Sequence, residues 1–336
     1  MRPLAVGRPR PESRLETIAT PLMWAVFTVF VIAALAVDLL VMRSNGPHRV
    51  TTREALLWSL AWIALALAFN AGLWFHLRGA MPADATRIAL EFFTGYLVEK
   101  ALAVDNIFVF LMLFTYFGVP ARSQQRVLVL GVLGAIVLRA ILIFVGAALI
   151  ARFHWILYVF GAFLLLTGLK MYRSAGAEPD MDRNPVLRWI TGHLPLVRRY
   201  HGEALWLGSG KRRRYTPLFV VLVMIAVTDV IFAVDSIPAI FAITTDPFVV
   251  LTSNVFAVLG LRALYFLLAD LADRFHLLVY GLATVLVFIG AKMLLVDVVK
   301  IPVWISLGTV GVVLAASMLL SLAVRPAPPR DSASRA

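Results

Sequence analysis

The sequence contains no cysteine and is poor in charge, since only 15% of its 336 residues are Asp, Glu, Lys or Arg. Without cysteine, the chain can form neither a disulfide framework nor a thiolate metal site. Soluble domains are about a quarter charged, whereas this chain is 61% hydrophobic with a mean hydropathy of +0.88. These deficits exclude an ordinary soluble domain and indicate a polytopic membrane protein.

Acidic residues are also scarce, 19 against 31 basic ones, which gives a net charge of +12. Nucleic-acid binding could explain such an excess, but the basic residues lie in loops between apolar segments. The preference of Arg and Lys for the cytoplasmic side of a membrane explains that distribution, so we expect no nucleic-acid partner.

The Arg- and Pro-rich residues 1–20 are expected to form a disordered tail. No small-residue cleavage site follows the first apolar segment, so we expect that segment to be retained.

Long apolar segments predict the fold class, because a transmembrane helix needs about 20 mainly apolar residues. We predict an all-α polytopic membrane protein with about nine transmembrane helices. The segments cover residues 21–42, 54–77, 89–117, 127–150, 153–172, 216–243, 248–269, 275–297 and 302–323.

The distribution of Arg and Lys outside these segments predicts the orientation. Eight basic residues lie on the side shared with the N-terminus and eighteen on the opposite side, nine of them in residues 173–214. By the positive-inside rule, we expect the N-terminus outside the cell. The basic 173–214 loop and the tail of residues 325–336 are then cytoplasmic.

Two similar acidic motifs lie inside the apolar segments. The first runs from Glu99 to Asn106 and reads Glu-Lys-Ala-Leu-Ala-Val-Asp-Asn; the second runs from Asp229 to Ser236 and reads Asp-Val-Ile-Phe-Ala-Val-Asp-Ser. A carboxylate near the centre of a bilayer costs several kcal/mol, so ionisable residues there are functional candidates. Two copies at matched spacing make a chance origin a poor explanation.

The motifs belong to a longer repeat. Residues 152–172 and 274–294 align without a gap and are identical at eight of 21 positions, and Leu138-Arg139 matches Leu261-Arg262. Each unit contains three spans, an odd number, so the second unit enters the membrane from the opposite side. Such inverted repeats are typical of secondary transporters, whose sites lie at the repeat interface near the midplane. The predicted parts are two leading helices in 21–88, repeat 1 in 89–172, repeat 2 in 215–297 and a final helix in 298–324.

The two acids of each motif lie six residues apart. In a straight helix they are separated by about 9 Å along the axis and about 120° around it, so they do not share one face. We expect the helix to unwind near them, because Gly95 precedes the first pair and Pro238 follows the second, and proline frees a backbone carbonyl. Broken backbone of this kind is tolerated in membranes where it lines a cavity or an ion site.

The chemistry of the motifs favours a hard divalent cation. Carboxylate, carbonyl and water oxygens suit magnesium, calcium or manganese, whereas copper or zinc would call for Cys or His. The predicted metal ligands are Glu99, Asp105, Asn106, Asp229, Asp235 and Ser236, with Asp38, Asn70 and Thr228 as accessory positions. Several acids at close quarters titrate as a coupled set, which offers a route to exchange of metal for protons.

Three basic residues, Lys100, Arg139 and Arg262, supply counter-charges in the same segments. The acids could therefore be structural ion pairs instead of ion ligands, because buried charges are generally paired. For Arg139 and Arg262 we favour a structural role, either locking helices together or holding an acid in position.

At these motifs the chain resembles the TerC/Alx family of bacterial integral membrane proteins. Residues 95–110 (GYLVEKALAVDNIFVF) resemble the family's first signature, and residues 232–248 (FAVDSIPAIFAITTDPF) its second; the match continues through 251–268. The resemblance covers roughly residues 20–320 except the long loop. It implies a multi-pass protein of the cytoplasmic membrane in the LysE-like transporter group, linked to tellurium-resistance gene clusters, that exports Mn²⁺. One departure is Ala226, where many relatives carry Glu.

These patterns favour a secondary transporter for a hard divalent cation, with proton coupling and no prosthetic group, and the resemblance implies that the cation is Mn²⁺ and that it is exported. The alternative is a membrane component of a metal-stress or secretion-linked metallation complex that binds metal without transporting it. Intramembrane aspartyl proteases also use two aspartates, in Tyr-Asp and Gly-x-Gly-Asp signatures. Neither Asp105 nor Asp235 lies in such a context, so we expect no enzymatic activity. The expected partners are the lipid bilayer, the metal cation and protons, while the sequence identifies no protein partner.

Overall fold

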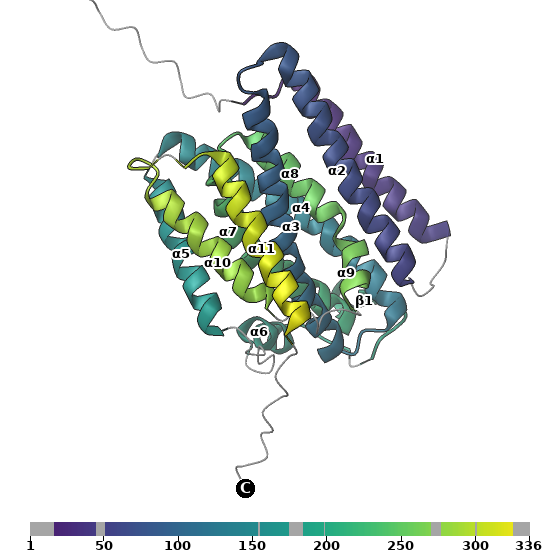
Figure 1. Ribbon diagram of the computed structural model, residues 1–336. Helices are drawn as coiled ribbons and strands as arrows, with labels where there is room; N and C mark the ends of the chain where they lie inside the picture. Colours follow the sequence, from purple (N-terminus) through teal and green to yellow (C-terminus); the bar gives the residue numbers. More distant parts are fainter. Residues whose placement is uncertain are drawn as a thin grey trace, which may run out of the picture.

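The computed structural model describes residues 17–44, 51–153, 155–174, 184–197, 199–269, 277–299 and 301–324. Within these ranges the protein is mainly helical, and the long helices form one bundle (Figure 1). The predicted C-terminal tail and most of the predicted N-terminal tail, up to residue 16, lie outside the described residues. The structure therefore tests the all-helical fold and leaves the two tails as predictions.

Helices occupy every apolar segment, and the segment 248–269 contains two of them. The long helices are α1 (Pro21–Ser44), α2 (Thr52–Ala80), α3 (Ala85–Tyr116), α4 (Ala121–Arg152), α5 (Ile156–Ser174), α7 (Pro217–Phe241), α8 (Pro247–Leu259), α9 (Leu261–Ala269), α10 (Leu278–Leu294) and α11 (Val303–Ala323). Side-chain caps define several starts, because Thr51, Asn184 and Asp246 accept bonds from the free amides of the first turns of their helices.

Five helices in the described ranges are long and apolar enough to cross a membrane, or six if α8 and α9 form one bent span. The helices α1 and α10 are apolar over shorter stretches. The helix α3 is 32 residues long but contains the charged motif from Glu99 to Asp105 and the pair Arg87 and Glu91. The chain is thus an all-helical polytopic membrane protein, and a total of nine spans remains a prediction.

The helices are arranged around α3, α4, α7 and α8. Of the described helices, α5 and α10 share the largest interface, α3 packs on α7 and α8, and α4 packs on α7 and α8. The helix α11 lies beside α10 and α3, and α2 lies beside α3 and α9. Figure 1 shows α1 and α2 along one edge of the bundle and α5 and α10 along the opposite edge.

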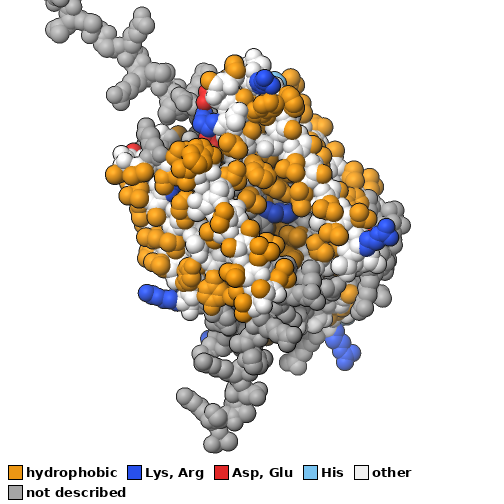
Figure 2. Space-filling model, in the orientation of Figure 1, with side chains coloured by type: hydrophobic (Ala, Val, Ile, Leu, Met, Phe, Trp, Pro, Cys, Tyr) orange, Lys and Arg blue, Asp and Glu red, His pale blue; other side chains and the backbone are white. Residues whose placement is uncertain are grey.

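Apolar side chains face both inward and outward. Three clusters of buried hydrophobic residues fill the bundle, while α1, α2, α4, α5 and α11 also carry many exposed Leu, Val, Ile and Phe residues. Hydrophobic side chains cover most of the described surface in Figure 2, and acidic ones are rare on it. Since a soluble protein seldom exposes such a large apolar surface, this surface fits contact with lipid.

The helix breaks are not where the sequence predicted them. The helices α3 and α7 run without interruption past both acidic pairs, and Pro238 is accommodated in the last turn of α7, so the prediction of unwinding there is wrong. The break lies at Gly260, where α8 and α9 meet at 43°. A Cβ atom at Gly260 would lie 2.7 Å from the Lys100 Nζ and 3.2 Å from the Trp62 Cβ. Glycine therefore allows α2 and α3 to approach this break closely.

The predicted 173–214 loop contains secondary structure that sequence analysis missed. The helix α6 (Pro185–His193) is followed by the strands β1 (Trp206–Leu207) and β2 (Arg214–Tyr215), with the 3₁₀ turn η2 (Gly210–Arg212) between them. The Tyr200 hydroxyl donates to the carbonyl of Phe117, 2.8 Å away at the end of α3. Burial raises the pKa of Tyr200.

Candidate functional site

Arg139 of α4 connects the two acidic motifs. Its guanidinium forms ion pairs with Glu99 of α3 and with Asp229 of α7, whose Oδ1 lies 3.2 Å from Nη2. All three side chains are buried, with exposed fractions of 1%, 0% and 4%. Glu99 and Asp229 are the equivalent first acids of the two motifs. We call this arrangement the Arg139 clamp.

The clamp explains how acids on separate helices come together without a break in either helix. The planar guanidinium carries five donors and can serve several oxygens at once. Its Nη1 also donates to the Oδ1 of Asn254 on α8, at 3.4 Å. Four helices, α3, α4, α7 and α8, therefore meet at one buried cation. The clamp contains two carboxylates for one guanidinium, which leaves a formal excess of one negative charge when both acids are ionised.

A cavity of about 230 Å³ adjoins the clamp, and we call it the central cavity. It is lined by Leu102, Asn106, Arg139, Thr167, Lys170, Met171, Phe232, Asp235, Ser236 and Leu286. The Thr167 hydroxyl donates to the Asp235 carboxylate at 3.4 Å, and the charge of Lys170 also acts on Asp235. The second acid of repeat 2 therefore lines a cavity between α3, α5 and α7 in which polar and apolar side chains both take part.

Several buried oxygens at this place have no hydrogen-bond partner among the described residues. They include the Oδ1 of Asn106, the Oγ of Ser236 and the Oδ2 of Asp229. Buried polar atoms are nearly always satisfied, by protein, by ordered water or by an ion. The central cavity is large enough for several water molecules. Its oxygens are consequently available to a hydrated cation.

No three Asp, Glu, His or Cys side chains among those described lie close enough together to hold a metal ion unaided. The side chain of Asp105 is outside the described set, as is that of Asp38, although their backbones lie in α3 and α1. A cation in the central cavity would therefore use Asp235, the neutral oxygens of Asn106 and Ser236, and water. Such mixed oxygen sets are usual for Mg²⁺ and Mn²⁺.

The remaining predicted residues lie elsewhere. The Lys100 ammonium donates to the carbonyl of Ala257 at 3.2 Å, near the C-terminal end of α8 where carbonyls lose their helical partners. Thr228 donates to carbonyls of its own helix, those of Met224 and Ile225. Arg262 is half-buried at the second position of α9.

Asn70 lies in α2, and its buried Oδ1 has no partner among the described residues. Neither Asn70 nor Thr228 is among the described residues that line the central cavity. The structure thus brings Asn106, Asp235, Ser236 and Arg139 together at one cavity, and the accessory positions Asn70 and Thr228 are not part of its described lining.

Three residues of this site are not among those predicted from the sequence: Asn254, Thr167 and Lys170. Asn254 binds Arg139 and Thr167 binds Asp235. A signal for Lys170 was present, because Lys170-Met171 and Lys292-Met293 are identical pairs in the aligned repeats. Nothing in the sequence indicates which side of α5 faces the acids.

Comparison with known proteins gives a consistent result. Residues 84–328 match the model of the "Integral membrane protein TerC family". The chain is 53% identical over 310 residues to Escherichia coli (strain K12) Alx, which is provisionally named a membrane-bound redox modulator; the match covers 91% of this chain and 96% of that protein.

Two further relatives are more distant. An uncharacterized membrane protein of Myxococcus xanthus, STKORF319, is 45% identical over 317 residues, covering 94% of this chain and 97% of the relative. An uncharacterized membrane protein of Rickettsia bellii is 38% identical over 284 residues, covering 84% and 91%. No solved structure matches this chain.

Proposed function

Because the chain belongs to the TerC family of integral membrane proteins, we propose that it is a secondary transporter that exports a hard divalent cation, Mn²⁺ above all, through the central cavity. The membrane is the bacterial cytoplasmic membrane, with the N-terminus outside and the basic 173–214 segment inside. Release or uptake of protons by the buried acids couples export of the cation to proton movement across the membrane.

The central cavity is the observation that carries this proposal. The half-buried Asp235 and the buried, unpartnered oxygens of Asn106 and Ser236 meet there, in an otherwise apolar bundle, with space for a hydrated ion. Desolvating a carboxylate in such surroundings is costly unless a cation or a proton compensates. The Lys170 side chain lines the same cavity, so an arriving divalent cation would repel its ammonium while it binds Asp235.

The Arg139 clamp places two further carboxylates, Glu99 and Asp229, beside the central cavity. Glu99 and Asp229 share one internal cation, and the net charge of the three groups near the cavity depends on whether Arg139 stays between the two acids. A metal ion in the adjoining cavity repels the guanidinium and attracts both carboxylates. Competition between metal, proton and guanidinium for the same acids is a physical basis for coupled transport.

Helix packing between α5 and α10 supports the inverted repeat. A Cβ atom on Gly168 would lie 2.9 Å from the carbonyl oxygen of Ala283, and one on Gly290 would lie 2.8 Å from that of Gly161. In the repeat alignment, Gly168 matches Gly290 and Gly161 matches Ala283. A two-fold axis requires such reciprocity, because a contact between two residues implies the same contact between their equivalents.

The other interfaces follow the same rule. The helix α3 of repeat 1 packs on α8 of repeat 2, and α4 of repeat 1 packs reciprocally on α7 of repeat 2. The first helix of each unit thus contacts the second helix of the other. This pattern supports a pair of inverted units that can exchange conformations around the central cavity.

A second candidate function is a metal-binding component that does not transport, within a metal-stress or secretion-linked assembly. The relative Alx is named as a redox modulator, which favours a form of this second function in which the bound metal affects redox chemistry elsewhere. This chain has no cysteine, so thiol exchange cannot be its own contribution. Binding without flux separates this candidate from the transporter.

The test is Mn²⁺ flux into proteoliposomes containing wild type or Asp235→Asn. We expect the variant to lose at least about nine-tenths of the flux, because it removes the charged ligand of the central cavity. Glu203→Gln is the matched control, since Glu203 is an exposed acid paired with Arg126 on the surface, and it should transport as wild type does. Equal flux from Asp235→Asn and wild type at matched folded protein would refute the site. Metal binding by wild type without flux would favour the second candidate.

A further inference from the structure

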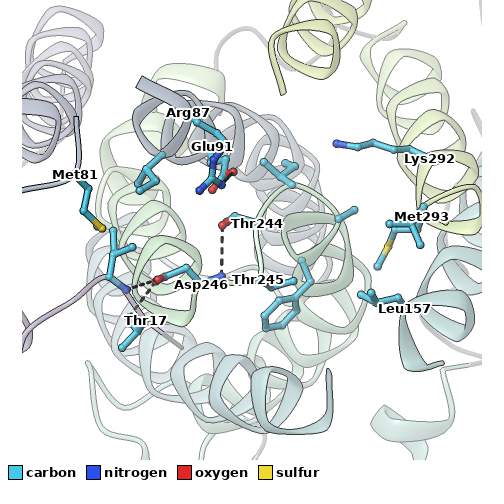
Figure 3. A pocket seen from close by; sticks show the side chains of 16 residues that line it. Thr17, Met81, Arg87, Glu91, Leu157, Thr244, Thr245, Asp246, Lys292 and Met293 are labelled. Carbon is cyan, nitrogen blue, oxygen red and sulfur yellow. Dashed lines mark hydrogen bonds and ion pairs between the residues drawn. The ribbon is translucent and has the colours of Figure 1, made fainter. Parts of the chain in front are cut away.

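A second and larger hollow lies where α3 begins and α7 and α10 end. Its volume is about 700 Å³, and we call it the vestibule. The polar residues around it include Arg87, Glu91, Thr244, Asp246 and Lys292 (Figure 3). The acidic motifs contribute no residue to its described lining, so the central cavity does not account for it.

Glu91 is the buried acid of the vestibule, with an exposed side-chain fraction of 7%. Its Oε1 lies 2.6 Å from the Nη1 of Arg87. Arg87 has another partner, because its Nη2 also lies 2.9 Å from Asp84, an exposed acid that is not among the lining residues. Arg87 therefore bridges Glu91, which lines the vestibule, and Asp84, which does not.

Lys292 faces the same space from α10. Its ammonium donates to the Oγ of Ser306 at 2.9 Å, and its charge acts on Glu91 across the vestibule. Glu91 and Thr244 both line the hollow, as Figure 3 shows. The carboxylate, the threonine oxygen and water provide the hard oxygen donors that a partly hydrated divalent cation accepts.

The repeat relates the vestibule to the central cavity. Lys170 and Met171 of α5 line the central cavity, and their equivalents Lys292 and Met293 of α10 line the vestibule. The two hollows therefore use the same pair of side chains from opposite repeats. In an inverted repeat, equivalent surfaces open toward opposite sides of the membrane.

We propose that the vestibule is the second half of the cation pathway and that Glu91 binds the cation there. This inference rests on the proposed transport function. Glu91 precedes Glu99 on α3 by eight residues, or about 12 Å along the helix axis. The equivalent position in repeat 2 is Val221, so the opposite half has no matching acid. Glu91 therefore affects cation binding from one side of the membrane only.

The first experiment compares Glu91→Gln with Asp84→Asn, each measured for Mn²⁺ flux in membrane vesicles of both orientations. Both variants remove a partner of Arg87, but only Glu91 faces the vestibule. We expect Glu91→Gln to raise the half-saturating Mn²⁺ concentration about tenfold from the vestibule side, with no change from the other side. Asp84→Asn should behave as wild type does. Equal effects of the two variants, or no effect of Glu91→Gln, would overturn the role of Glu91.

The second experiment uses the natural absence of cysteine, which makes any introduced thiol unique. Lys292→Cys and Lys170→Cys are treated with a membrane-impermeant cationic thiol reagent in vesicles of each orientation. We expect the two variants to react from opposite sides, and reaction at either to inhibit Mn²⁺ flux. Reaction of both from the same side, or complete reaction without inhibition, would overturn the pathway.

The outcomes that would overturn the role of the vestibule can be distinguished from those that would overturn the proposed transport function. If Asp235→Asn abolishes flux while Glu91→Gln and modified Lys292→Cys transport normally, transport through the central cavity stands and the vestibule is not part of it. If wild type shows no flux, the proposed function itself fails.

Discussion

At the residue scale, Arg139 determines whether two buried acids stabilise or disrupt the bundle. Glu99 and Asp229 lie on separate helices and are almost fully shielded from water. Removing one partner of a buried ion pair costs about 3–5 kcal/mol, because the remaining charge is left uncompensated. Two carboxylates depend on this one guanidinium, so its loss affects both.

We therefore expect Arg139→Met to lower the free energy of unfolding by about 3–5 kcal/mol. The measurement is the thermal unfolding midpoint in detergent micelles. Adding Glu99→Gln and Asp229→Asn to the same chain removes the stranded charges, and should recover most of the lost stability. An unchanged midpoint in the single variant, or no recovery in the triple variant, would show that the clamp does not carry this energy.

The residues that sequence analysis could identify at this site were those with charge in an apolar context. Glu99, Asp229 and Arg139 were identified because their presence in a membrane is costly. Thr167 and Asn254 were missed, because uncharged polar residues are common in membrane helices and cost little. Their roles depend on which face of α5 and which face of α8 point inward. That is a property of the tertiary structure, and a single sequence with few polar positions in each helix does not reveal it.

At the element scale, the α5–α10 interface depends on two glycines at equivalent positions of the repeats. A Cβ atom on Gly168 would lie 3.0 Å from the backbone nitrogen of Val287, and one on Gly290 would lie 2.7 Å from that of Leu165. Backbone atoms cannot move aside as a flexible side chain can. The helices would have to separate to admit even a methyl group.

Gly168→Ala and Gly290→Ala should each destabilise the protein by about 1–3 kcal/mol, the usual cost of overpacking. Gly311→Ala is the matched control, because a Cβ atom at this position of α11 meets nothing within 4 Å. There alanine should be neutral or stabilise the helix by up to about 1 kcal/mol. Thermal unfolding of the three variants checks this. Different effects at Gly168 and Gly290 would argue against a shared, symmetric interface.

The positions of the helices followed from the sequence, whereas their breaks did not. Apolar length determines where a segment can enter a membrane, and that signal is strong for α4 and α7. Glycine and proline are ambiguous signals, because each has several structural uses. Pro238 is tolerated in the final turn of α7, while Gly260 breaks the α8–α9 span to admit Lys100 and Trp62. Local sequence did not distinguish these two outcomes.

At the scale of the whole molecule, the arrangement of the two hollows follows from the repeat. The central cavity and the vestibule are lined by matching Lys-Met pairs from α5 and α10. Their unequal volumes, about 230 and 700 Å³, mean that the two halves differ in this conformation. Exchange of the two repeat conformations would close the vestibule and open the central cavity. The proposed transport by alternating access would then require no new structural element, only a swap between two packings already present.

The whole molecule also has a predicted orientation, which follows from basic residues outside the helices. Eighteen lie on the side of the 173–214 segment and eight on the side of the N-terminus. Ala83 lies exposed between α2 and α3, and Ser209 lies exposed between β1 and β2. The positive-inside rule places Ala83 outside the cell and Ser209 in the cytoplasm.

Single thiols in this cysteine-free chain test that orientation. We expect Ala83→Cys to react with an impermeant maleimide only in right-side-out vesicles, and Ser209→Cys only in inside-out vesicles, because the lipid bilayer blocks the reagent. Detergent-permeabilised vesicles provide the control, since both variants should react there. If Ala83→Cys reacted only in inside-out vesicles and Ser209→Cys only in right-side-out ones, the orientation would be opposite to the predicted one. The vestibule would then open to the cytoplasm, and export would have to start there. Reaction of both variants from one side would contradict the odd number of spans between the two positions, and with it the inverted repeat.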